Sequence, residues 1–252
     1  MLLRSNEERE SILLDIEGTI CPITFVKDVL YPYFLEKLPN YISNLRFPIA
    51  EKSGQIVNDI CYGFPKEAKS SKEDFQKYIK DLVTQDIKDP VLKSLQGLVW
   101  KEGYDKGEIT APLYEDAFRY IERAVQAGKS VYIYSSGSVK AQVMLFEHVQ
   151  GPDGGSYDIR HLLSGYYDIN NAGYKTEPQS YQKILNDIGY AEQAHKVSFF
   201  SDNVKEVDAA LKTGMEAFVV VKPGNPSIDS SDRQRHKVIS SFDDTSEQMR
   251  NI

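Results

Sequence analysis

The sequence predicts an α/β fold in which a parallel β-sheet is interrupted, after its first strand, by a helical insertion. Short apolar runs that end at turn residues alternate with segments whose apolar residues recur at helical spacing. This alternation is typical of parallel strands joined by right-handed crossover helices. One long interval carries only the helical pattern, and a chain of 252 residues has room for a main domain with a smaller inserted one.

The expected strands are apolar runs that stop at polar or turn residues. The first begins at Ser11 and ends at Asp15, and it is followed by a second acid, Glu17, and by Gly18. Three β-branched or aromatic runs of the same kind lie at residues 130–134, 196–200 and 217–221. The carboxyl ends of parallel strands share one edge of a sheet, which is where open α/β folds bind their ligands.

Helices are expected between the later strands, at residues 114–127, 139–149, 180–188 and 204–212. The first of them stops at Gly128, and Ser138 is a suitable N-cap for the second. Residues 25–110 contain further segments of helical spacing and no β-rich run. These residues can simply be further crossover helices, but their length and the lack of a strand favour an inserted helical unit.

The overall composition narrows the class of protein. A net charge of −7 argues against a dedicated nucleic-acid-binding protein, which is usually basic. No apolar run is long enough to span a bilayer, and the N-terminus lacks the apolar core of a signal peptide. The two cysteines, Cys21 and Cys61, are too few for a disulfide framework and indicate a reducing compartment. We expect a monomer in the cytoplasm and also the nucleus, with no nucleic-acid or membrane partner.

Residues that can do chemistry follow the ends of the expected strands, together with one lysine in a loop before a helix. They are Asp15, Glu17, Ser135, Ser136, Lys175, Asp202 and Glu206. Taken alone, each has an ordinary explanation as a turn, a helix cap or a surface residue. Their ordered occurrence at successive strand ends favours one shared site. Glu206 is the exception, because it can equally lie on a solvated helix face.

Such a set meets the needs of phosphate monoester cleavage, in which an anionic nucleophile must approach a doubly charged phosphate. Mg²⁺ prefers oxygen ligands and keeps several waters. Asp15 and Asp202 would supply two carboxylates to it, and the main-chain carbonyl of Glu17 can supply a third oxygen. Lys175 would neutralise the phosphate as a point charge.

The remaining roles follow from the same chemistry. Asp15 would attack phosphorus and form an aspartyl-phosphate. Glu17 would protonate the leaving oxygen and then take a proton from the hydrolytic water. The Ser135 hydroxyl and the amides around Ser136 and Gly137, which open a helix, would hold the phosphate oxygens.

These motifs resemble those of the haloacid dehalogenase superfamily of phosphatases with an aspartate nucleophile, whose first motif usually reads Asp-x-Asp-Gly-Thr. Here the second acid is Glu17. That departure resembles a narrower family, the enolase-phosphatases (acireductone synthases) of methionine salvage. Residues 95–97 with Trp100, residues 131–139 and residues 220–225 are similar to the same family. The similarity covers nearly the whole chain.

The resemblance implies a Rossmann-like haloacid dehalogenase core at residues 1–24 and 111–242, with an inserted helical cap at residues 25–110. Residues 243–252 would form a polar C-terminal tail. It also implies one Mg²⁺ per subunit, held at Asp15, Glu17 and Asp202. Substrate would be bound at Ser135, Ser136 and Lys175, and the catalytic residues would be Asp15 and Glu17.

The resemblance further implies two reactions at one site. The small phosphorylated diketo substrate, 2,3-diketo-5-methylthiopentyl-1-phosphate, is enolised and then dephosphorylated to the acireductone 1,2-dihydroxy-3-keto-5-methylthiopentene. The base for the enolisation is left open between Glu17 and a cap residue near Gln96, Trp100 and Lys101. The alternatives are a phosphatase of the same superfamily acting on another small phosphate ester, and a catalytically silent scaffold, which the complete residue set disfavours.

Overall fold

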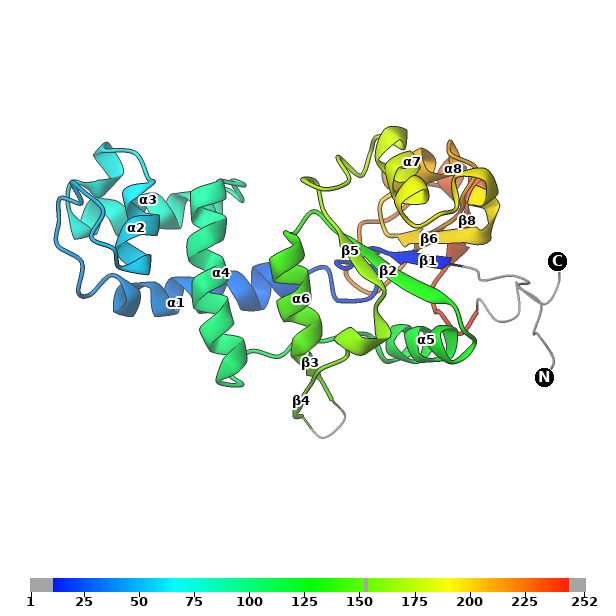
Figure 1. Cartoon of the computed structure of the whole chain (residues 1–252), viewed down its shortest axis with the longest axis horizontal. Helices are drawn as coiled ribbons and strands as arrows, with labels where there is room; N and C mark the ends of the chain where they lie inside the picture. Colours follow the sequence, from blue (N-terminus) through cyan, green and yellow to red (C-terminus); the bar gives the residue numbers. More distant parts are fainter. Residues whose placement is uncertain (1–10, 152–153, 245–252) are drawn as a thin grey trace. The chain divides into compact units, whose positions relative to one another are not determined.

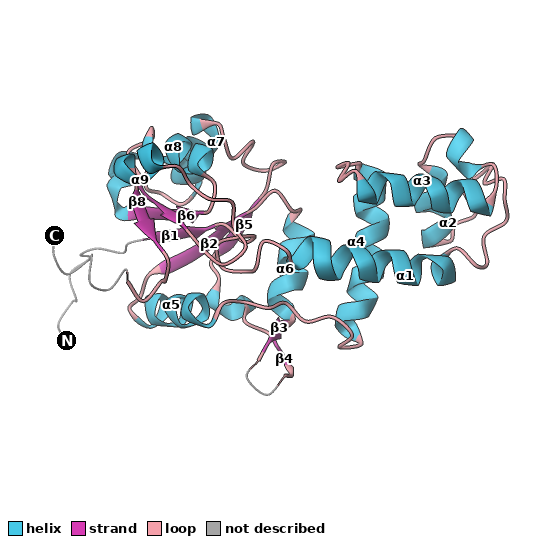
Figure 2. Cartoon of the chain, turned by 180° about the vertical axis from the view of Figure 1, so that it is seen from behind, coloured by secondary structure: helices cyan, strands magenta, loops and turns pink. Residues whose placement is uncertain are grey.

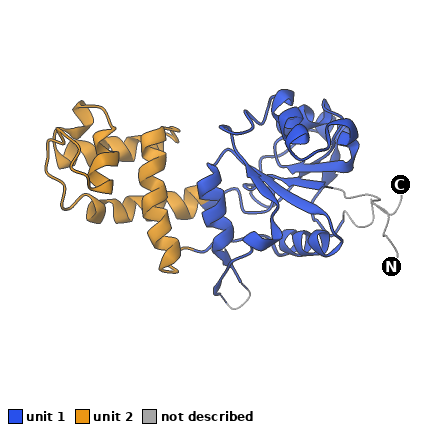
Figure 3. Cartoon of the chain, in the orientation of Figure 1, with its two compact units in different colours: residues 1–25, 110–252 blue, residues 26–109 orange. Residues whose placement is uncertain are grey.

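The computed structural model describes residues 11–151 and 154–244 and divides into two compact units (Figure 3). Unit 1 combines residues 1–25 with residues 110–252, and unit 2 consists of residues 26–109. Unit 2 is therefore a continuous insertion after the first strand of unit 1. Most of the expected C-terminal tail lies outside the described residues.

Unit 1 is built on a parallel sheet. Among the described residues, the sheet has six strands in the order β5-β2-β1-β6-β7-β8 (Figure 1). Their bounds are β1 (Ser11–Leu14), β2 (Ser130–Tyr134), β5 (Gly165–Tyr167), β6 (Val197–Ser201), β7 (Glu216–Val220) and β8 (Lys237–Ile239). All neighbouring strands are parallel, and Leu14 lies opposite Ile133 on one side and Phe200 on the other. The chain that leaves β1 is therefore flanked by the chains that leave β2 and β6.

Helices cover both faces of this sheet (Figure 2). One face carries α5 (Glu115–Gln126), and the other carries α7 (Pro178–Asp187) and α8 (Val204–Leu211). Two more helices are α6 (Val139–Glu147), which follows β2, and α9 (Ser230–Arg235), which precedes β8. The four helices and four strands predicted from the sequence are confirmed to within two residues at each end.

The remaining regular elements of unit 1 are short. They are the antiparallel pair β3 (Val149–Gln150) and β4 (Ser156–Tyr157) and the 3₁₀ helices Arg160–Leu162 and Ala191–Lys196.

Successive residues of the central strands point to opposite faces of the sheet, as the pleat requires. Phe199 packs with Leu13 and with Tyr181 of α7. Its neighbour Phe200 stacks on Phe218, with ring centroids 4.7 Å apart, on the face that carries α5. The strand β1 is buried along its whole length, which explains why it is apolar at every position after Ser11.

Two strands of the sheet, β5 and β8, were not predicted. Each has only three residues, too few to show a strand pattern of its own. The strand β8 forms because Val238 pairs with Val219 of β7, and Phe242 is buried just beyond it. Tertiary pairing rather than local preference decides such short edge strands.

Unit 2 is helical, and all of its residues are described. It contains a π-helical turn at Val26–Leu30, a 3₁₀ turn at Glu67–Lys69, and α1 (Tyr31–Tyr41), α2 (Ile56–Tyr62), α3 (Lys72–Thr84) and α4 (Pro90–Asp105). The starts of α3 and α4 are capped by Ser71 and Asp89, whose side chains accept main-chain N–H groups. The unit has a core of its own around Phe34, Phe75 and Leu95.

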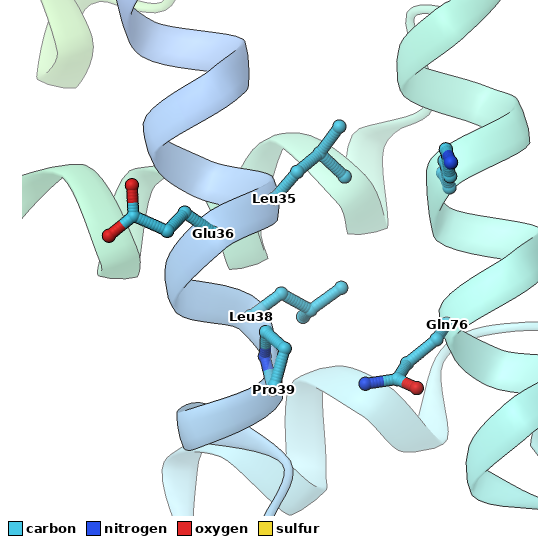
Figure 4. A pocket seen from close by; sticks show the side chains of 6 residues that line it. Leu35, Glu36, Leu38, Pro39 and Gln76 are labelled. Carbon is cyan, nitrogen blue, oxygen red and sulfur yellow. The ribbon is translucent and has the colours of Figure 1, made fainter.

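A cavity of about 430 Å³ lies within unit 2, between α1 and α3 (Figure 4). It is lined by Leu35, Glu36, Leu38, Pro39, Gln76 and Lys80. None of the residues predicted to do chemistry lines it. Across the described ranges of both units, no helix combines the length and apolar character needed to cross a membrane.

A buried ion pair fastens the C-terminal segment to α5. Asp116 Oδ2 pairs with Lys222 Nζ and accepts hydrogen bonds from Ser241 Oγ at 3.1 Å and from the Phe242 amide at 2.9 Å. Burial alone would raise the pKa of Asp116, but these partners lower it below its usual value. The carboxylate is therefore ionised and satisfied.

Replacing Asp116 with alanine would leave the buried Lys222 ammonium without its carboxylate. We expect the free energy of unfolding, measured in urea, to fall by about 3–5 kcal/mol. The control is Glu115→Ala, because the exposed Glu115 pairs with Arg119 at the surface, and its loss should change stability by about 0.5 kcal/mol or less. Equal losses in the two variants would contradict the role assigned to Asp116.

Candidate active site

The site lies where the central strands end. Asp15 directly follows β1, and its amide donates to the Phe200 carbonyl at 3.0 Å. Ser135 directly follows β2, and its amide donates to the Tyr167 carbonyl of β5 at 3.1 Å. Both residues thus continue the sheet ladder by one step, which fixes their backbones before the chain turns away.

Lys175 is the buried cation of the site. Its Nζ lies 2.5 Å from Asp15 Oδ1 and 2.6 Å from Glu206 Oε2, and the side chain is only 7% exposed. Burial alone would lower the pKa of Lys175, but the negative charges of Asp15 and Glu206 outweigh it and raise that pKa above its usual value. The ammonium therefore stays charged.

The loop that presents Lys175 is held by buried hydroxyl groups. Tyr134 donates to the Gly173 carbonyl at 2.7 Å, and Tyr181 donates to the Lys175 carbonyl at 2.7 Å. Gly173 has a φ of +120°, and a Cβ there would lie 2.5 Å from Ser180 Oγ. Other residues would be strained at this position, so glycine allows the loop conformation that delivers the lysine.

Asp202 follows β6 and is held by the turn after β1. Its amide donates to Thr19 Oγ1 at 3.0 Å. Its carboxylate lies directly against Gly18, which has a φ of +74° and where a Cβ would come within 2.5 Å of Asp202 Oδ2. Burial, followed by the negative charges of Asp15 and Glu206, raises the pKa of Asp202 to about 7.

The charges of the site are unbalanced. The carboxyl groups of Asp15, Asp202 and Glu206 influence one another, and Lys175 is the ammonium that ion-pairs with two of them. Burial, and then the charge of Asp15, also raises the pKa of Glu206. Hard carboxylate oxygens with uncompensated negative charge fit a divalent cation such as Mg²⁺.

Within residues 11–151 and 154–244, no three His, Cys, Asp or Glu side chains are arranged to hold a metal ion by themselves. The side chains of Asp15, Glu17 and Asp202 do not form such a group in this arrangement, and the predicted metal set stays a prediction. Glu17 is exposed, whereas Asp15 is buried. The two aspartates with the main-chain carbonyl of Glu17, as the sequence analysis also allowed, remain a suitable donor set.

The Ser135–Ser138 segment is partly committed to bonds within the protein. The Gly137 amide donates to Ser135 Oγ at 3.2 Å, and the Val139 amide, at the start of α6, donates to Asp168 Oδ2 at 2.9 Å. In the part of the chain that the structure describes, the Ser136 amide donates to no protein acceptor. Of the two amides expected to bind phosphate, Gly137 is thus already engaged.

The structure adds two residues that the sequence analysis did not single out. Ser201 is fully buried, and its hydroxyl donates to Glu206 Oε2 at 2.7 Å. Asn225 donates from Nδ2 to the Gly18 carbonyl at 2.8 Å. Ser201 comes directly after a predicted strand, and Asn225 ends the segment 220–225 whose resemblance to the enolase-phosphatases was its sequence signal. Glu206, which was left open, belongs to the site because it pairs with Lys175.

The three residues predicted to assist the enolisation, Gln96, Trp100 and Lys101, lie in α4 of unit 2. The Trp100 indole donates to the Leu30 carbonyl at 2.9 Å and stacks on Tyr31. Lys101 pairs with Asp105 at 2.6 Å, and Gln96 is buried. Structural contacts therefore explain Trp100 and Lys101, and a role in proton transfer stays a prediction.

Known proteins match nearly the whole chain. A sequence model of haloacid dehalogenase-like hydrolases matches residues 10–214. Enolase-phosphatase E1 of Debaryomyces hansenii is 51% identical over 93% of this chain and 95% of its own length. That of Clavispora lusitaniae is 54% identical over 91% of this chain and 97% of its own length.

Solved structures of other proteins are also similar to this chain. The crystal structure of the UTR4 protein of Saccharomyces cerevisiae has a TM-score of 0.80 and 42% identity, and covers 94% of this chain and 100% of that one. CbbY of Rhodobacter sphaeroides, solved in complex with phosphate, has a TM-score of 0.57 at 13% identity, covering 92% of this chain and 94% of that one. The second similarity concerns the fold alone.

Gly18→Ala should displace Asp202, because the added methyl group would overlap its carboxylate. We expect divalent-cation affinity, measured by calorimetry, to fall at least about tenfold. The matched control is Gly128→Ala, whose φ is +81° but whose Cβ would meet nothing within 4 Å, so that it carries the backbone strain alone. Equal cation affinity in the two variants would rule out the contact as a constraint on the site.

Asp202→Asn should stabilise the metal-free protein at high pH. The carboxyl group ionises near 3.8 when unfolded and near 7 when folded, so its destabilising effect is absent in acid, grows between those values and is complete above pH 7. We expect the Tm in a chelating buffer to rise by roughly 3–6 °C at pH 8, with a smaller rise at pH 5. Glu192→Gln, at an exposed position, is the control, and the prediction fails if Asp202→Asn is no more stable than it at pH 8.

Proposed function

Because the chain belongs to the enolase-phosphatase family of haloacid dehalogenase-like hydrolases, we propose that it enolises 2,3-diketo-5-methylthiopentyl-1-phosphate and then dephosphorylates it to the acireductone of methionine salvage. The observation that carries the proposal is the buried pairing of Asp15 with Lys175 at the end of β1. A buried carboxylate whose position is fixed by a neighbouring ammonium is suited to attack a phosphate ester.

Asp15 is the proposed nucleophile. Its Oδ1 lies 2.5 Å from Lys175 Nζ, and this contact orients the carboxylate. A carboxylate oxygen bonds to phosphorus while the bond from phosphorus to the substrate's C1 oxygen breaks. Water then attacks the aspartyl-phosphate, which releases phosphate and restores the carboxylate.

Glu17 is the proposed proton carrier of this reaction. It lies two residues after Asp15 but is exposed, so it can meet the leaving group and the incoming water from the solvent side. It protonates the leaving C1 oxygen and later accepts a proton from the attacking water. The base that removes the C1 proton in the preceding enolisation is Glu17 or a residue of unit 2.

The phosphate group would be held by Lys175, the Ser135 hydroxyl and the Ser136 amide. The proposed cation is one Mg²⁺, held by Asp15, Asp202 and the Glu17 carbonyl, and it would supply positive charge against the phosphate. Support comes from the donor chemistry and from the raised pKa of Asp202, which reflects burial and excess negative charge. Catalysis would then consist mainly of positioning and charge stabilisation.

The test follows the diketo phosphate by two signals, the ultraviolet absorbance of the enol and the release of phosphate. In the wild type, enol absorbance should rise before phosphate appears, and a chelator should stop phosphate release until Mg²⁺ is restored. Asp15→Asn should lower phosphate release at least about 10³-fold while the far-ultraviolet circular dichroism stays unchanged. Unchanged turnover in Asp15→Asn would refute the mechanism.

Glu17→Gln separates the two candidate bases in the same assay. Phosphate release should slow, and an aspartyl-phosphate should be trapped by rapid quenching. If enol formation slows as well, Glu17 is the base of the first step; if it does not, the base lies elsewhere. Phosphate release with no enol at any time, in this variant and in the wild type, would favour the alternative, a phosphatase for another small ester.

A further inference from the structure

Gln142 of α6 is a buried polar residue that the proposed reaction does not use. Its side chain is 2% exposed, and Oε1 has no hydrogen-bond partner among the described residues. A buried acceptor without a partner destabilises the folded protein. The stability of α6 therefore does not explain this residue, and such groups in native proteins call for a functional explanation.

The other end of the side chain supplies that explanation. Gln142 Nε2 donates to the Gly137 carbonyl at 2.8 Å and to the Tyr167 carbonyl at 2.9 Å. The Tyr167 carbonyl also accepts the Ser135 amide. One side-chain amide thus ties the far end of the proposed phosphate-holding segment to the same β5 carbonyl that anchors its beginning.

The bond to Gly137 also orients the next peptide group. In a planar trans peptide the carbonyl oxygen and the following N–H point in opposite directions. Because the Gly137 carbonyl points to Gln142, the Ser138 N–H points away from it. Within the described ranges this N–H donates to no protein acceptor, whereas the neighbouring Val139 N–H is taken by Asp168.

We propose that Gln142 is a positioning residue that aims the Ser138 N–H at the phosphate group of the substrate, and thereby sets phosphate affinity without touching the substrate. The proposal rests on the function proposed above, since it assumes that the segment after β2 holds phosphate. An N–H at the start of a helix is well suited to an anion once its direction is fixed.

The test uses Gln142→Met, which keeps the size of the side chain and removes both donor bonds. With Mg²⁺ present, the Kd for inorganic phosphate, measured by calorimetry, should rise about tenfold. KM for the substrate should rise in the same proportion, with kcat within about twofold, and the Kd for Mg²⁺ should not change. The control is Met144→Ala, which removes buried contacts of the same helix and should lower Tm while leaving phosphate affinity intact.

A measurement on the wild type keeps the proposal testable if Gln142→Met does not fold. In ¹⁵N-labelled protein, the Ser138 amide resonance should shift when inorganic phosphate is added, and more than the Val139 resonance. A Gln142→Met protein that binds phosphate like the wild type, or a Ser138 resonance that does not respond, overturns the proposal.

The outcomes separate this proposal from the proposed function. If the wild type does not turn over the diketo phosphate, but Gln142→Met binds phosphate more weakly than the wild type, the proposed function fails and the positioning role stands. If the wild type is active and Gln142→Met binds phosphate normally, the positioning role alone fails.

Discussion

The site depends on one buried ammonium. Lys175 contacts Asp15 and Glu206 at the same time, in a place where each carboxylate is at most 12% exposed. Taking charges out of water is unfavourable, and carboxylates repel one another unless a cation lies between them. Without Lys175, the strand end that carries Asp15 would be a buried cluster of like charges with no protein cation in contact with them.

Much of the surrounding structure delivers that ammonium to its place. The tyrosine hydroxyls of Tyr134 and Tyr181 hold the loop carbonyls on either side of Tyr174, and Ser201 orients Glu206 from the end of β6. These groups are buried, so their hydrogen bonds are made in a medium where an unmade bond is expensive. The result is a preorganised site, which is what positioning and charge stabilisation require.

The cluster remains short of positive charge after Lys175 has been counted. The raised pKa of Asp202 reflects both its burial and this excess, and it makes the metal-free site less stable than a neutral one would be. A site with the proposed function, which binds a cation and a phosphate dianion in turn, has to tolerate this excess of negative charge. The excess negative charge that suits the proposed function therefore lowers the stability of the folded protein at this edge of the sheet, as is common for active sites.

The local pattern of the sequence by itself determined the main strands and helices and several residues of the site. Apolar runs and helical spacing predicted the central strands, four crossover helices and the helical insertion, because burial on a sheet or along a helix face imposes a period on the sequence. Polar residues at strand ends then located Asp15, Ser135 and Asp202, since parallel strands end at one edge. Membership of the enolase-phosphatases was already indicated by Glu17.

Only the tertiary structure decided the contacts between residues far apart in the chain. It placed Glu206 against Lys175, Asn225 against Gly18 and Gln142 against Gly137. It also added the edge strands β5 and β8, which take their form from the strands beside them. A glutamine in a helix, or three residues in a polar segment, has no periodic signature. The role of such residues arises from partners that only the folded chain brings within hydrogen-bonding distance.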